Sequence, residues 1–243
     1  MKHLLILLSF FLLFSSIFIS CSKSSDDGSK STDNTTSTDN TTTTDNTTTT
    51  DNTTTSSWTQ QLGTTFNDYG FSVTSDSSNN IYVTGYTWGE LDGNTSSGGR
   101  DIFLLKYNSS GTRQWTKQLG TTYTDSGLGV INDSSGSIYV TGSTGGGLDG
   151  NTNYGNDCSV PPGFWNSINN CSDIFLVKYN SSGTKQWTKQ LGTSSGDYGN
   201  DVTTDSSGNI YVTGSTWGGL DGNTNSGSYD IFIVKYNSSG IKQ

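Results

Sequence analysis

Histidine is almost missing from this sequence, which contains only His3. If the N-terminus is removed during export, the mature chain has no imidazole, which excludes Ser–His and Cys–His catalysis and imidazole metal sites. Glutamate is nearly as rare after that point, with Glu90 alone. Because no acidic pair stands apart from repeated turn motifs, we expect a protein that is not an enzyme, with a glycoside-acting enzyme as an alternative.

Basic residues and helix-forming residues are also scarce. The chain has 12 Lys and Arg against 21 Asp and Glu, for a net charge of −9. An acidic surface disfavours nucleic acid as a partner. Glycine (31 residues), Ser, Thr, Asn and Asp dominate the composition, and these residues favour turns over helices. The composition therefore predicts an all-β protein.

The first long apolar run lies at the N-terminus. Lys2 and His3 precede "LLILLSFFLLFSSIFIS", which ends at Ser20, directly before Cys21. A basic start, an apolar run and small residues before a cleavage site are typical of a secretory signal. The "FIS" before Cys21 resembles a bacterial lipobox, so residues 1–20 are predicted to be a lipoprotein signal peptide and Cys21 to carry the lipid. An uncleaved transmembrane anchor is the alternative.

Residues 21–57 contain almost nothing that could form a core. Their repeated "TDNTTT" carries an aspartate every six residues and no apolar side chains. Such a segment cannot offset the entropy cost of ordering. We therefore predict a lipidated cysteine followed by a disordered tether, and an exported protein anchored in the cell envelope, at the outer membrane or cell surface.

Residues 58–243 consist of three copies of one unit. "IYVTG" begins at 81, 138 and 210, "DIF" at 101, 173 and 230, and "WTQQLG" or "WTKQLG" at 58, 115 and 187. The copies are spaced by 57 and 72 residues, the second spacing containing an insertion at 153–172. Each copy contains four short strand candidates, and the third strand is apolar on both faces, which indicates sheets stacked face to face. Antiparallel four-stranded units of this length are typical of propeller blades.

The repeated text also resembles a known family. "DSSGNIYVTGST" followed by "DIFLVKYNSSGTKQW" is similar to the bacterial SBBP β-propeller repeat, which implies a β-propeller of a kind found in secreted proteins and lipoproteins. The resemblance covers all three copies and implies little about function, since propellers serve many functions. The predicted fold is a propeller-type array of three four-stranded antiparallel blades.

The third copy ends at "NSSGIKQ" without its "WTKQLG", while "WTQQLG" at 58–63 has no blade before it. We expect residues 58–63 to complete the last blade by pairing alongside 230–236. Closed propellers normally need at least four blades. The array is therefore expected to be an open or distorted ring, a homodimer that exchanges "WTQQLG", or a shortened member of a longer family.

Long loops should gather on one face of this array and carry the spare aromatic and acidic side chains. A loop-rich face on a rigid scaffold is typical of a binding module, for a protein or glycan ligand. The "LDGNT" loops could be structural turns or weak calcium sites, the latter within a lectin-like propeller that binds carbohydrate. The candidate ligand-binding residues there are Trp88, Trp217, Tyr69 and Tyr198, and the candidate calcium ligands are Asp92, Asp149, Asp221 and Asn223.

The insertion supplies the remaining candidates. Cys158 and Cys171 are predicted to form a disulfide, because exported proteins meet oxidising conditions. Phe164 and Trp165, in "PPGFW", could present an aromatic contact to a partner, as binding hot spots often do. A loop stapled only against proteolysis is the alternative.

Overall fold

The computed structural model describes residues 57–155 and 172–243, which belong to one structural unit, Thr53–Gln243. In these two ranges no helix has the length and apolar character needed to cross a membrane. Several predictions fall outside the described residues and stay predictions: the signal peptide, the lipid on Cys21, the tether, the Cys158–Cys171 disulfide, and the roles of Phe164 and Trp165.

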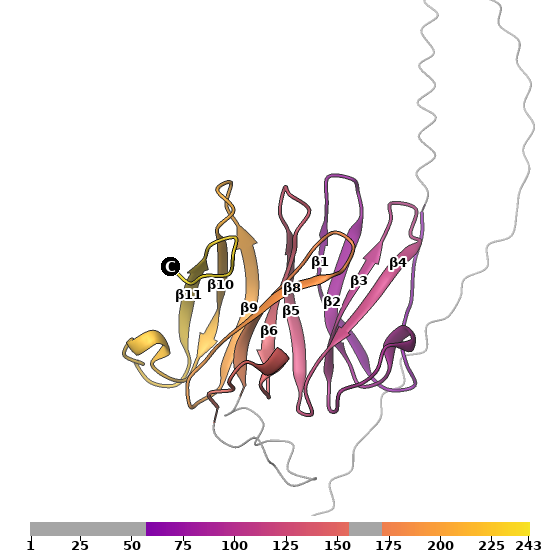
Figure 1. Cartoon of the computed structure of the whole chain (residues 1–243). Coiled ribbons are helices and arrows are strands. Elements are labelled where there is room, and N and C mark those ends of the chain that lie inside the picture. Colours follow the sequence, from indigo (N-terminus) through magenta and orange to yellow (C-terminus); the bar gives the residue numbers. More distant parts are fainter. Residues whose placement is uncertain (1–56, 156–171) are drawn as a thin grey trace, which may run out of the picture. The chain divides into compact units, whose positions relative to one another are not determined.

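The described residues form an all-β array of three antiparallel sheets, here called blades 1, 2 and 3 (Figure 1). Blade 1 consists of β1 (Asp68–Ser75), β2 (Ile81–Thr87), β3 (Asp101–Tyr107) and β4 (Arg113–Leu119). Blade 2 consists of β5 (Asp125–Asn132), β6 (Ile138–Thr144), β7 (Asp173–Tyr179) and β8 (Lys185–Leu191). Blade 3 consists of β9 (Asp197–Thr204), β10 (Ile210–Thr216) and β11 (Asp230–Tyr236). The predicted fold class is confirmed.

Tight turns close one end of every blade. In the "DSSG" turn of blade 2, the Asp133 carboxylate accepts the backbone N–H groups of Ser135 and Ser137, each at 2.9 Å. Gly136 completes this turn with a φ of 80°, a left-handed conformation that glycine adopts at little cost. The "NSSG" turns use Asn108 and its counterparts in the same way. The long loops consequently lie together at the opposite end (Figure 1).

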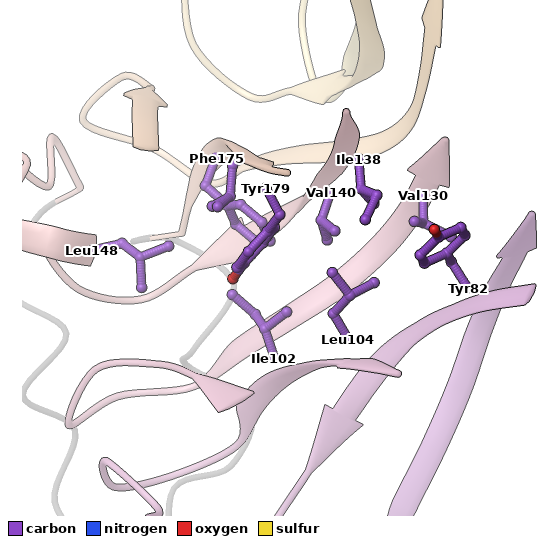
Figure 2. Packing of buried hydrophobic residues seen from close by; sticks show 10 residues of the cluster. Tyr82, Ile102, Leu104, Val130, Ile138, Val140, Leu148, Phe175 and Tyr179 are labelled. Atoms are coloured by element: carbon purple, nitrogen blue, oxygen red, sulfur yellow. The ribbon is translucent and has the colours of Figure 1, made fainter. Parts of the chain in front are cut away.

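The core lies between neighbouring blades. Ile102 and Leu104 of β3 face blade 2, where they pack with Val130, Phe175 and Tyr179 (Figure 2). The intervening residues of β3, Phe103 and Leu105, belong to a different cluster on the other face of blade 1. A second interface of the same composition joins blades 2 and 3. The apolar residues on both faces of the third strand are explained by these two packed surfaces.

One part of the prediction is wrong within the single chain. Blade 3 has the strand order β11-β10-β9, and residues 58–63 neither form a strand nor pair with 230–236. Instead, Trp58 stacks on Tyr107 of blade 1 with ring centroids 6.3 Å apart, and Leu62 packs against the apolar cluster of that blade. The physical reason is apolar packing of both side chains against blade 1, which blade 2 separates from blade 3 (Figure 1).

Candidate functional site

The candidate site is the end of the array that carries the long loops, here called the loop face. Each blade contributes a loop before its first strand and a second loop between its second and third strands. The loop-face segments are 63–67, 88–100, 120–124, 145–155, 192–196 and 217–229.

Aspartates that are buried in blades 2 and 3 and half-buried in blade 1 fix these loops at the first strand of each blade. In blade 2, Asp125 accepts the Thr121 backbone N–H at 2.6 Å and the Thr144 hydroxyl at 2.5 Å. Asp68 and Asp197 make the same contacts in blades 1 and 3. These carboxylates are therefore bound to the scaffold.

A second set of aspartates opens the third strand of each blade. Asp101 accepts the Gln118 side-chain amide at 2.8 Å, and the Gln118 carbonyl accepts the Leu91 N–H at 3.0 Å. In blade 2 the same contacts join Asp173 with Gln190. One oxygen of Asp101 and one of Asp173 are buried without a hydrogen-bond partner among the described residues. Within the described part of the chain, each of these two carboxyl groups therefore accepts hydrogen bonds through one of its oxygens only.

Burial sets the acidity of the carboxyl groups between blades. Burial raises the pKa of Asp125 to about 6, and the charge of Asp101 on the adjoining blade adds to the effect. Burial also raises the pKa of Asp173 to about 6, again with a contribution from the adjoining blade, through Asp197. Carboxyl groups of adjoining blades therefore repel each other when both are ionised.

We expect the protein to be more stable at pH 5 than at pH 7.5. The native state holds a proton on Asp125 up to about pH 6, whereas an unfolded chain releases it near pH 4. Between these values the native state binds more protons, so the free energy of unfolding rises as the pH falls, by at most about 3 kcal/mol from this residue. In thermal denaturation, the Asp125→Asn variant should gain less stability than the wild type between pH 7.5 and pH 5. The Asp221→Asn variant, which changes a surface residue, should gain as much as the wild type. A flat profile for the unchanged protein would contradict the assignment.

An exposed aromatic cluster lies on the loop face of blade 3. The Trp217 and Tyr229 rings meet edge to face with centroids 4.8 Å apart, and the Tyr198 and Tyr229 centroids are 6.1 Å apart. Trp217 keeps 45% of its surface exposed and Tyr229 keeps 43%. Rings held in this way have little side-chain freedom to lose when a ligand binds.

A second aromatic cluster lies on the loop face of blade 1. Tyr69 and Tyr86 are cross-strand neighbours with ring centroids 5.1 Å apart. The Arg100 guanidinium lies 4.6 Å from the centroid of the Tyr86 ring and 5.7 Å from that of Trp88. Arg100 thus joins two aromatic side chains through cation–π contacts.

Blade 2 has no such cluster among its described residues. Its equivalent positions hold small side chains, namely Ser126, Ser143, Gly145 and Ser172. The four predicted ligand-binding residues therefore divide into two groups, Tyr69 with Trp88 and Tyr198 with Trp217. Sequence reasoning missed Tyr86, Arg100 and Tyr229, which complete the clusters. Arg100 and Tyr229 directly precede a "DIF" motif, at a position that varies between the copies, and this variation could have identified them.

The "LDGNT" loops form short 3-10 turns, η1 (Leu91–Gly93), η2 (Leu148–Gly150) and η4 (Leu220–Gly222). Their leucines are buried, and their aspartates adopt positive φ values of 53–56°. The Asn223 side-chain amide donates to the Leu220 carbonyl at 2.8 Å. The motif thus forms a turn anchored by an apolar side chain.

The candidate calcium ligands lie in three separate loops. Asp92 pairs with Arg113, Asp149 with Lys185, and Asp221 with Lys242. Within the part of the chain that the structure describes, no three or more His, Cys, Asp or Glu side chains gather at a point where they could hold a metal ion. The calcium hypothesis stays a prediction.

Comparison with known proteins identifies the repeat in this sequence. A model described as "Beta-propeller repeat" (SBBP) matches residues 57–92, 114–149 and 186–221. The chain carries three SBBP β-propeller repeats. Each SBBP match runs from the "WTQQLG" or "WTKQLG" segment through the first two strands of the following blade to the "LDG" turn.

Two proteins that contain similar sequence are much longer. The SBBP region is 28% identical to the "Uncharacterized WD repeat-containing protein L264" of Acanthamoeba polyphaga mimivirus, over 74% of this chain and 15% of that protein. It is also 28% identical to the "Regulatory protein FlaEY" of Caulobacter vibrioides, over 63% of this chain and 16% of that protein. The chain thus spans about a sixth of the length of these relatives, and the matches support the repeat rather than a shared activity.

Proposed function

We propose that this SBBP repeat protein is a binding module of the cell envelope, held by a lipid on Cys21. The observation that carries the binding role is the pair of partly exposed aromatic clusters on the loop face, one on blade 1 and one on blade 3. The proposed role is binding without catalysis. Support comes from the buried aspartates of the loop face, whose carboxylates accept hydrogen bonds from the scaffold.

The chemistry of the clusters favours a ligand with a flat apolar surface and hydrogen-bonding groups at its rim, such as a sugar chain. Tyr and Trp offer a broad apolar ring together with one polar group, which suits a contact that is partly wet. The Trp217–Tyr229 pair forms an angled aromatic surface, with the rings inclined at 64°. The net charge of −9 disfavours strongly acidic polysaccharides and favours neutral or basic ligands.

The proposal predicts a loss of binding when the exposed ring of Trp217 is removed. We expect Trp217→Ala to weaken binding to a neutral glycan about 30-fold, since a central aromatic contact commonly contributes 2 kcal/mol or more. The measurement is a glycan array screened with the full chain, followed by titration of the best ligand. Ile241→Ala, an exposed apolar residue in the tight turn at the other end of blade 3, serves as the matched control and should bind normally.

Two outcomes would contradict the proposal. One is an array without any bound glycan, and the other is equal loss of binding in both variants. Binding of an envelope protein in place of a glycan, still dependent on Trp217, would keep the site and overturn the carbohydrate assignment.

A further inference from the structure

We propose that two copies of this chain join in a ring of six blades, with residues 58–62 of each copy acting as the fourth strand of blade 3 in the other. This interface is formed by the side faces of blades 1 and 3, and its loop-face end adjoins the aromatic clusters proposed above for ligands. It rests on four features of the described residues: an exposed face, an incomplete strand, an empty hollow, and a segment placed to fill it.

The exposed face belongs to β11 in blade 3. Ile231 and Ile233 are 93% and 73% exposed. Their counterparts Ile102 and Leu104 in blade 1, which pack against blade 2, are 3% and 1% exposed. The repeat thus places apolar side chains where another blade should pack, and contiguous exposed apolar patches mark interaction sites.

The fourth strand of blade 3 begins in this chain but is not completed by the described residues. Lys242 pairs with Tyr236, and the Gln243 N–H donates to the Lys235 carbonyl at 2.9 Å. Lys185 pairs with Tyr179 in the same way at the start of β8 in blade 2. Continuing the β8 register along β11 would place a "WTQQL" strand with its tryptophan opposite Lys235 and its second glutamine opposite Phe232.

A hollow of about 310 Å³ lies at that position, lined by Gly218, Leu220, Asp230 and Phe232 among others. In blade 1 the equivalent space holds the Gln118 side chain, which donates to the Gly89 carbonyl at 2.9 Å as well as to Asp101.

Gln190 fills the same space in blade 2, donating to the Gly146 carbonyl and to Asp173. Gln61 holds this position in "WTQQLG". The Gln61 amide could therefore make the corresponding contacts with Gly218, Leu220 and Asp230. Among the described residues, no glutamine makes these contacts in blade 3.

Residues 58–62 already lie where the fourth strand of a preceding blade would lie. A methyl group at Gly183 would meet the Trp115 ring at 3.1 Å, and one at Gly111 would meet the Trp58 ring at 2.6 Å. Trp58 thus sits on the "NSSG" turn of blade 1 as Trp115 sits on that of blade 2. Leu62 likewise packs on blade 1 as Leu119 does on the core between blades 1 and 2.

The first strand of blade 1 shows the same missing neighbour. Val73 is 65% exposed, whereas its counterparts Val130 and Val202, which face a preceding blade, are 4% and 5% exposed. Among the described residues, blade 3 therefore exposes the face on which a following blade would pack, and blade 1 exposes the face on which a preceding blade would pack.

A second copy of the chain satisfies both requirements at once. Within one chain, blade 2 lies between the two incomplete surfaces (Figure 1). Two copies related by a two-fold axis would use each surface once and give six blades, within the range of closed propellers. Closure would also remove the unpaired edge of β11, which otherwise invites aggregation.

The test is a disulfide between copies. The β8 register pairs Leu176 with Lys189, which translates to Ile233 opposite Gln60. Close cross-strand cysteines meet the distance requirement of a disulfide. A full chain carrying Gln60→Cys is mixed under mild oxidation with a differently tagged chain carrying Ile233→Cys. We expect a covalent pair containing both tags, absent from wild type and from a Gln60→Cys/Ile231→Cys mixture, which is out of register.

Solution mass and affinity complete the test. We expect sedimentation of the full chain in detergent to give two chains per particle. Ile233→Asp should raise the Kd at least 100-fold and Gln61→Leu at least tenfold, whereas Gln60→Leu should leave it within threefold. A single chain per particle, absence of the doubly tagged covalent pair, or an open series of higher oligomers would each overturn the proposal. None of these outcomes would alter the Trp217 dependence of ligand binding.

Discussion

Replacing Phe175 with alanine is expected to lower the free energy of unfolding by about 3–5 kcal/mol. Phe175 is fully buried in the cluster between blades 1 and 2, which also contains Leu148 and Tyr179 (Figure 2). Its removal leaves a cavity that neighbouring strands cannot close, because the sheets are held on both sides by hydrogen-bonded ladders. In urea denaturation the midpoint should fall while the slope stays unchanged.

The matched control for this variant is Phe71→Ala. Phe71 lies in β1, is 52% exposed, and contacts the Tyr86 ring at a centroid distance of 5.5 Å. The same chemical change there should cost below about 1 kcal/mol, since little apolar surface returns to water. Equal losses at the two positions would contradict a core located between the blades.

Replacing Gly85 with alanine is expected to destabilise the protein by about 3 kcal/mol, more than most single-methyl additions. A methyl group on Gly85 would lie 1.8 Å from the Tyr69 carbonyl oxygen and 2.8 Å from the Phe103 ring. The first contact is with backbone, which can move only by separating β1 from β2. This explains why all three "IYVTG" copies carry glycine at this position, since Gly142 and Gly214 show the same close approach.

A second glycine in blade 1 provides the comparison. A methyl group on Gly70 would meet only the Val83 side chain, at 3.7 Å, an ordinary packing distance. Gly70→Ala should therefore change the free energy of unfolding by less than about 0.5 kcal/mol, measured by thermal and urea denaturation of both variants. A loss at Gly85 as small as that at Gly70 would show that the strands tolerate more separation than the structure allows.

Much of the fold could be predicted because the same pattern of strands and turns occurs in three copies. The apolar residues on both faces of "DIFLLKY" required a blade on each side, and the "DSSG" and "NSSG" turns required a meander. The position of residues 58–63 could not be predicted in the same way. Their similarity to β4 and β8 identified the kind of strand, but not which blade they would contact, because that depends on which apolar surface is within reach.

The candidate site was predicted in part for a related reason. Tyr69 and Trp88 were visible as spare aromatic residues, but their grouping with Tyr86 depends on a bulge at Phe71 that sets the register of β1 on β2. A shift of one residue would turn Tyr86 to the other face of the sheet. Arg100 was missed because its contacts are with rings on another segment, and a charge before "DIF" predicts no partner by itself.

The backbone contact that links each blade to the next has a consequence for valency. The residue before "DIF" accepts a hydrogen bond from the first strand of the following blade, Arg100 from Asp125 and Ser172 from Asp197, both at 2.7 Å. In a ring of two chains, Tyr229 would make this contact with Asp68, beside Tyr69. The aromatic clusters of the two subunits would then merge into two identical binding sites, each formed by both chains. A ligand that presents several copies of its binding group could occupy both sites at once and would bind more tightly through avidity.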